Sequence, residues 1–277
     1  MVSAFLIPFR ETLEATLIVG VVLAYLHKTN NQSLQKHVYF GVAAAIVASI
    51  LTAIGFQVFA GGFSGTAEEI FEGVTMLLAS GVLTYVVFWM AAQTRFHEHI
   101  QKKVDLHLSE GKALGLAALS FFAVYREGVE TILFMGATAF AAGGQLDLPL
   151  ALAGIGSAMI LGYLVFNTAL RFRLKTIFAA TSILLILFAA GLFAHGVHEF
   201  QEAGVLPTPF GKIWNTNWLL DEASLAGTFA KALFGYNADP FGLEAIAYAA
   251  YLLVIGGLYI SWLKPARAKH HPHAKTR

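Results

Sequence analysis

Seven long apolar stretches divide the chain, and each can cross a lipid bilayer as a helix, which takes about 20 residues. They cover residues 2–26, 38–60, 70–92, 113–141, 148–170, 177–197 and 245–263. In a bilayer every backbone polar group must be hydrogen-bonded within the protein, so only helices and closed barrels span it. These stretches lack the alternating pattern of a membrane barrel. We therefore expect an all-α integral membrane protein with seven transmembrane helices.

The composition agrees with this class. Hydrophobic residues make up 57% of the chain and charged residues 13%, against about 25% charged residues in an average soluble domain. The absence of cysteine excludes disulfides, thiolate metal sites and cysteine nucleophiles. The formal net charge of +1 gives no reason to expect a nucleic-acid partner. Because charges interrupt the first apolar stretch and no basic region precedes it, we expect a retained helix rather than a cleaved signal peptide.

The basic residues predict the orientation. Lysine and arginine gather in the first, third and fifth connections and in the tail, whereas the second and fourth connections have none and the sixth has two lysines. Since cytoplasmic connections carry the excess of basic residues, we expect an outer N-terminus and a cytoplasmic C-terminus in a plasma membrane, the inner membrane in a bacterium. The expected layout is a permease domain over 1–263, with an outer loop at 198–243, and a basic cytoplasmic tail over 264–277.

The first six spans form a weak internal repeat. Residues 1–92 and 113–197 each contain a charged helix, an uncharged helix and a helix with polar groups near its outer end. Three spans is an odd number, so the second copy is inverted in the membrane, as in many transporters with a midplane site. The seventh span, 244–263, has no counterpart, and we expect it to be peripheral.

The charges of the repeats form two matching clusters near the middle of their spans. Arg10, Glu11 and Glu14 read R-E-x-x-E, and Arg126, Glu127 and Glu130 repeat this order. Ionisable groups at membrane depth cost several kcal/mol unless they pair or line a cavity, so they indicate a functional site. On a helix the two glutamates of each motif share a face with the arginine.

Together the two motifs supply four carboxylates and two guanidiniums, with a formal charge of −2. A purely structural salt bridge would not leave carboxylates in excess over arginine. Carboxylate oxygens suit hard cations, and the arginines can hold carboxylates by bidentate bonds. The pattern predicts a pathway for a multivalent cation.

These motifs resemble the oxidase-dependent iron permease family, which includes fungal high-affinity iron permeases and the bacterial EfeU-like permeases. His198–Gly204 (H-E-F-Q-E-A-G), Leu233–Tyr236 (L-F-G-Y) and the A-V-Y before the second motif also resemble this family, and the likeness covers most of the chain. The resemblance implies iron passage with Glu11, Glu14, Glu127 and Glu130 as ligands. It also implies Fe3+ supplied by an outer oxidase or peroxidase system and an iron-binding partner, with iron as substrate and no permanently bound cofactor.

Candidate entrance residues lie at the outer ends of two spans. Glu68, Glu69 and Glu72 begin the third span, and the sixth span ends with residues at i, i+3, i+4 and i+7, namely His195, His198, Glu199 and Glu202. Either group could collect metal, although polar helix ends also occur simply where a helix meets water. Tyr85 and Trp89, near an inner span end, are predicted interface anchors.

Two alternatives remain open at this point. The same architecture could carry another divalent metal, such as Pb2+ or Mn2+. A membrane di-iron carboxylate enzyme is a second alternative. Such bundles use Glu-x-x-His pairs, whereas both motifs here end in glutamate and the first histidine inside a span is His195.

Overall fold

The computed structural model of the protein describes residues 2–92, 113–141, 147–167, 174–222 and 224–263. These residues form α1 (Val2–Lys28), η1 (Gln32–Leu34), α2 (Gln35–Ala60), α3 (Thr66–Ala92), α5 (Ala113–Ala141), α6 (Leu148–Asn167), α7 (Leu174–Glu202), α8 (Leu225–Phe234), α9 (Gly242–Tyr251), the π-helical turn η2 (Leu252–Gly256) and α10 (Gly257–Leu263). Among the described residues the only β-type pairing is an isolated bridge between Lys212 and Phe241. The predicted all-α class is confirmed.

Every predicted span lies on a helix over its described residues, and 168–170 of the fifth predicted span lie outside them. Among the described residues, five stretches are long and apolar enough to cross a membrane by length and composition: Gln32–Ala60, Thr66–Trp89, Leu148–Phe166, Thr181–Glu202 and Gly242–Ser261. The helices α1 and α5 are 27 and 29 residues long, and each carries the three charges of its motif inside the apolar stretch. The predicted basic tail, 264–277, and most basic residues of the third and fifth connections lie outside the described residues.

The turns at several helix ends use residues that tolerate a positive φ. Asn30 (φ 57°) follows α1, Gly65 (φ 60°) precedes α3, and Gly235 (φ 65°) ends α8. Only glycine adopts this left-handed region without steric cost, with asparagine next. At its C-terminal end α7 continues to Glu202, five residues beyond the expected end at Val197.

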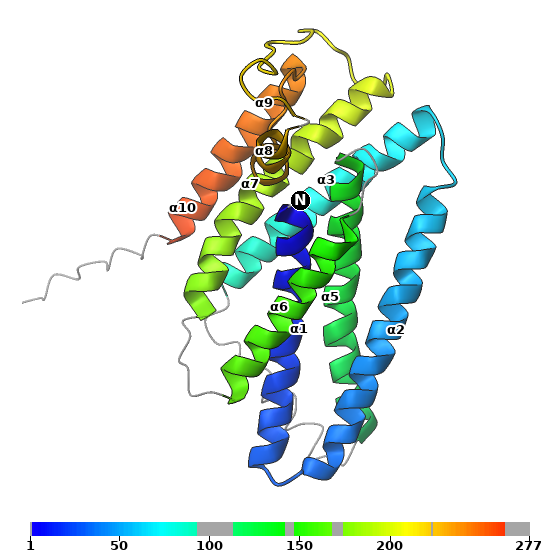
Figure 1. Cartoon of the computed structure of the whole chain (residues 1–277), viewed down its shortest axis with the longest axis vertical. Coiled ribbons are helices and arrows are strands. Elements are labelled where there is room, and N and C mark those ends of the chain that lie inside the picture. The colour runs from blue at the N-terminus through cyan, green and yellow to red at the C-terminus, as the bar shows by residue number, and fades with distance from the viewer. Residues whose placement is uncertain (1, 93–112, 142–146, 168–173, 223, 264–277) are drawn as a thin grey trace, which may run out of the picture.

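The helices associate in three close pairs (Figure 1): α1 with α6, α2 with α5, and α3 with α7. Glycines let two of these pairs approach closely, since a Cβ on Gly154 would lie 2.4 Å from the Phe5 carbonyl oxygen and one on Gly41 would lie 2.2 Å from that of Ala117. Small residues at such contacts are typical of membrane helices. The first helix of each predicted repeat therefore packs on the second helix of the other.

The third helices of the two predicted repeats pack on each other. A Cβ on Gly73 of α3 would lie 3.1 Å from the Gly196 carbonyl oxygen, and one on Gly196 of α7 would lie 3.1 Å from that of Gly73. The Ser80 hydroxyl donates to the Ala189 carbonyl at 2.8 Å along the same contact. Because Gly73 and Ser80 meet Gly196 and Ala189 in reverse order, α3 and α7 are antiparallel.

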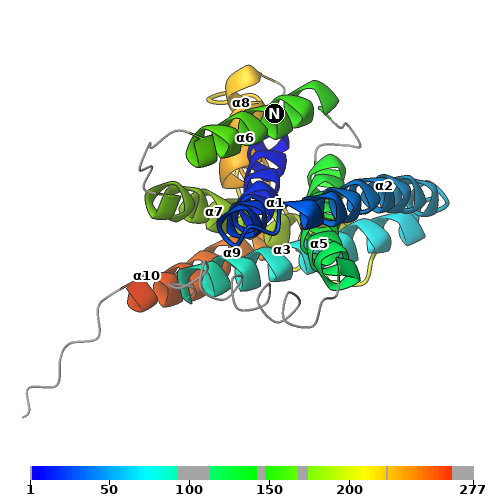
Figure 2. The ribbon, with the colours of Figure 1, turned by 90° about the horizontal axis from the view of Figure 1, so that it is seen from below.

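The helices that belong to none of these pairs include α8 and α9, which both contact α7. Seen from below, α1 lies near the centre with α5 and α6 beside it, whereas α2 and α10 lie towards the periphery (Figure 2). The seventh apolar stretch packs on α7 through α9, and the Tyr251 and Thr84 hydroxyls are 2.5 Å apart where it meets α3. Large apolar side chains of α2, such as Leu51 and Val58, are exposed on the single chain, which suits a lipid-facing helix.

Candidate functional site

The two R-E-x-x-E motifs lie side by side at the middle of α1 and α5. Glu14 is the thirteenth of the 27 residues of α1, and Glu127 is the fifteenth of the 29 residues of α5. The two helices are in contact. The apolar residues on either side keep the chain helical and place the charges far from both helix ends. The motifs therefore meet at similar depth.

In the first motif one arginine binds both carboxylates. Arg10 Nη1 is 2.5 Å from Glu11 Oε1, and Arg10 Nη2 is 2.7 Å from Glu14 Oε1. All three side chains are buried, with Arg10 only 2% exposed. The guanidinium presents several N–H donors in a fixed plane, which lets it satisfy two carboxylates at once. Both glutamates of this motif therefore form ion pairs with the arginine of the same motif.

The second motif is arranged differently. Arg126 Nε is 2.8 Å from Glu130 Oε1 but 3.8 Å from Glu127 Oε1, and its side chain is 43% exposed. Its guanidinium carbon lies 5.1 Å from the centre of the Trp89 ring, a cation–π contact with α3. Glu127 itself is buried. Thus the first glutamate of this motif is only distantly paired with its own arginine.

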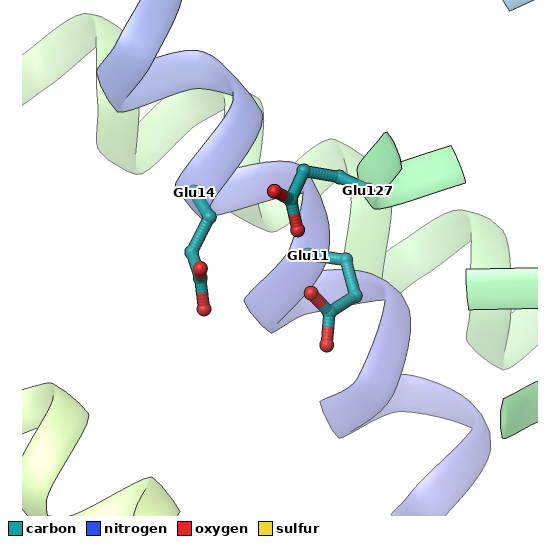
Figure 3. Close-up of side chains that lie close together, drawn as sticks. All are labelled: Glu11, Glu14 and Glu127. Atoms are coloured by element: carbon teal, nitrogen blue, oxygen red, sulfur yellow. The ribbon is translucent and has the colours of Figure 1, made fainter. Parts of the chain in front are cut away.

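Three carboxylates from the two helices converge (Figure 3). Each of Glu11, Glu14 and Glu127 offers an oxygen, and these oxygens all lie within 4.8 Å of one another. Within the described part of the chain this is the one group of three or more acidic, histidine or cysteine side chains with that spacing. The fourth predicted ligand, Glu130, belongs to the same motif as Glu127. Its side chain is buried and forms an ion pair with Arg126.

Several oxygens of this cluster lack a hydrogen-bond donor. Glu11 Oε2, Glu127 Oε2 and Glu130 Oε2 are buried and accept no hydrogen bond from the described residues. A buried polar atom without a partner costs about 1–3 kcal/mol, and more when it is charged. A multivalent cation between these carboxylates would satisfy both the free oxygens and the excess negative charge. The arrangement is chemically suited to a hard cation with oxygen ligands.

The acidic entrance candidates lie where the start of α3 meets the end of α7. Glu68 is exposed, Glu69 and Glu72 are half-buried, and Glu199 is buried. A Cβ on Gly73 would lie 3.2 Å from Glu199 Cβ, so the two helix ends are in contact. Glu72 interacts electrostatically with Glu199 and Glu202.

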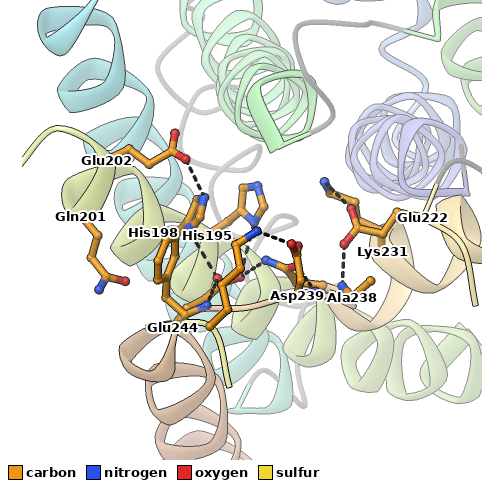
Figure 4. Close-up of polar contacts among 12 residues, drawn as sticks. His195, His198, Gln201, Glu202, Glu222, Lys231, Ala238, Asp239 and Glu244 are labelled. Atoms are coloured by element: carbon orange, nitrogen blue, oxygen red, sulfur yellow. Dashed lines mark hydrogen bonds and ion pairs between the residues drawn. The ribbon is translucent and has the colours of Figure 1, made fainter. Parts of the chain in front are cut away.

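The two histidines of the entrance set face a different helix (Figure 4). His198 Nδ1 lies 3.3 Å from Glu244 Oε2 of α9, and His195 Nδ1 lies 3.9 Å from Glu244 Oε1. The other ring nitrogen of His198 is 3.2 Å from Glu202 Oε1. Glu244 also accepts hydrogen bonds from the Asn237 side chain (2.8 Å) and the Phe241 backbone N–H (3.4 Å). The four residues predicted to share a helix face thus divide between contacts to α3 and contacts to α9.

Two residues that contact the predicted site residues, Glu244 and Trp89, were not themselves predicted to take part in a site. Glu244 could have been noticed as a glutamate three residues after Phe241, at the start of a helix, where it can accept from the backbone N–H groups of the first turn. Trp89 was expected only as an interface anchor. Its contact with Arg126 depends on how α3 lies against α5, for which the sequence carries no local signal.

The chain is similar to known proteins along nearly its whole length. Residues 1–266 match the model of the Iron permease FTR1 family. The chain is 34% identical to "Ferrous iron permease EfeU" of Yersinia pestis over 96% of this chain and 94% of the relative, and 33% identical to the protein of the same name from Escherichia coli O6:K15:H31 over 97% of both chains. An "Uncharacterized protein" of Archaeoglobus fulgidus is 33% identical over 93% of this chain and 94% of its own length. No solved structure matches the chain.

Proposed function

The chain belongs to the Iron permease FTR1 family, and from this membership and its site we propose that it moves iron through Glu11, Glu14 and Glu127. Members of the family are permeases, that is transporters rather than enzymes, so the di-iron enzyme alternative is not retained. The observation that carries the proposal is the convergence of three buried carboxylates at the middle of two long helices. In our proposal Arg10 and Arg126 hold the carboxylates and moderate their charge, and Glu130 assists from the second motif.

We further propose that the site lies at the interface of two inverted three-helix repeats, α1–α3 and α5–α7, with the seventh span outside them. The packing supports this symmetry. If the two repeats are exchanged, α1 takes the place of α5, α2 that of α6, and α3 that of α7. The α1–α6 contact then becomes the α5–α2 contact, and the α1–α5 and α3–α7 contacts stay the same. Transporters of this kind bind their substrate near the midplane between repeats. In the proposed orientation the N-terminus is outside and the C-terminus is cytoplasmic, in a bacterial-type inner membrane.

The valence of the iron is part of the proposal. The names of the EfeU relatives specify ferrous iron. A set of carboxylates, however, favours hard cations, and Fe3+ is a harder ion than Fe2+. We propose that Fe3+ enters the carboxylate site after an outer oxidase or peroxidase partner has oxidised ferrous iron, with Glu72, Glu199 and Glu202 collecting it at the entrance.

Reconstituted liposomes test the pathway. Influx through the wild-type protein should favour iron over Mn2+, Zn2+ and Pb2+, measured separately with Fe2+ held reduced by ascorbate and with Fe3+–citrate. Glu14→Gln and Glu127→Gln should abolish influx, because each removes one of three converging carboxylates without changing the side-chain size. The exposed Asp221, which belongs to neither motif nor to the entrance set, gives the control Asp221→Asn, which should retain most of the influx.

The outcomes separate the alternatives. Undiminished influx in both Glu14→Gln and Glu127→Gln would refute the pathway. Preference for Mn2+ or Pb2+ would instead change the substrate while keeping the site.

A further inference from the structure

The two arginines of the site differ in what they bind. Arg10 contacts both glutamates of its motif, at 2.5 and 2.7 Å, and is buried. Arg126 contacts the second glutamate of its motif at 2.8 Å and stands 3.8 Å from the first. The motifs have the same sequence pattern, so the difference must come from their surroundings.

The surroundings of Arg126 include an aromatic ring on a neighbouring helix. Arg126 lies over the Trp89 ring of α3, 5.1 Å from its centre, and 43% of its side chain is exposed. An aromatic ring attracts a guanidinium through its negative face. The contact therefore attracts the guanidinium towards α3.

Glu127, the glutamate that lies farther from Arg126, is also the one whose carboxylate lies close to the first motif. Glu127, not Glu130, has an oxygen within 4.8 Å of those of Glu11 and Glu14. An arginine that paired closely with Glu127 would compete with a cation for the same oxygens. We propose that Trp89 is a positioning residue that holds Arg126 away from Glu127 and so keeps that carboxylate available to the transported cation. This inference rests on the proposed function.

Influx kinetics in liposomes made with the full-length chain test this role, with ascorbate-reduced Fe2+ and Fe3+–citrate as the two probes. In Trp89→Leu, Arg126 should move onto Glu127, so the KM for iron should rise about threefold or more, the scale of a lost cation–π contact, with little change in the maximal rate. Trp89→Phe keeps an aromatic face and should restore most of the affinity. Tyr85→Leu removes an exposed aromatic one turn earlier on α3 and should leave the KM unchanged.

A second background separates positioning from a general structural role. If Trp89 acts through Arg126, then Trp89→Leu should have no further effect on the KM in an Arg126→Gln protein. An unchanged or lower KM in Trp89→Leu, or the same rise with and without Arg126, would overturn the inference. Influx that persists in Glu127→Gln would instead refute the proposed pathway, whatever the result at Trp89.

Discussion

The contact between α1 and α6 gives a quantitative test of how the site is held in place. A Cβ on Gly154 would lie 2.4 Å from the Phe5 carbonyl oxygen and 3.2 Å from the Phe9 backbone nitrogen. Ordinary contact begins near 3.5 Å, so Gly154→Ala requires the two helices to separate by about 1 Å. The obstacle is backbone, which cannot rotate away. Arg10 follows Phe9 directly, so α1 would move beside the site.

The magnitude follows from the cost of overpacking. Inserting a methyl into a well-packed contact costs about 1–3 kcal/mol, and a chain of this size loses roughly 2–4 °C in Tm per kcal/mol. We expect the apparent Tm of Gly154→Ala in detergent to fall by about 5 °C. Iron influx should fall as well, because the carboxylates of α1 and α5 would no longer converge at the same spacing.

Gly156, two residues further along α6, provides the control. A Cβ there has no atom within 4 Å, so Gly156→Ala changes helix propensity in the same way without a collision. Its Tm should stay at or above the wild-type value, since alanine favours a helix over glycine by about 1 kcal/mol. If Gly154→Ala and Gly156→Ala had equal Tm and equal influx, the inferred close contact between α1 and α6 would be incorrect.

Two further predictions concern the ion pairs. Arg10→Gln should destabilise the protein by about 3–5 kcal/mol, because Glu11 and Glu14 would stay buried without their cation. Thermal unfolding measures this loss. An Arg10→Lys protein with full stability and full iron influx would contradict the inference that the guanidinium binds both carboxylates. Glu244→Gln should cost about 1.5–3 kcal/mol by weakening charged hydrogen bonds between α9 and its neighbours. Glu202→Gln, at a side chain that is 52% exposed, should change the stability by less than about 1 kcal/mol. An equal loss in both variants would contradict the role of Glu244 in joining α9 to α7.

The sequence alone determined the features that depend on local pattern. Hydropathy predicted where the long helices lie, because about 20 apolar residues are needed to cross a bilayer. Among the described residues, five of these stretches are long and apolar enough to span a membrane. The i, i+3 and i, i+4 spacing predicted that Arg10 would reach Glu14 and that Arg126 would reach Glu130, as the ion pairs at 2.7 and 2.8 Å show. Both depend only on helix geometry.

The tertiary structure decided which side chains meet across helices. The two motifs are identical in pattern, yet Glu127 joins Glu11 and Glu14 while Arg126 turns to Trp89. Likewise the histidines at the end of α7 contact Glu244 of α9, more than 40 residues away in sequence. Such contacts depend on how each helix is rotated and tilted against its neighbours. Long-range packing at residues such as Gly41 and Gly154 sets those rotations, and no local sequence pattern encodes them.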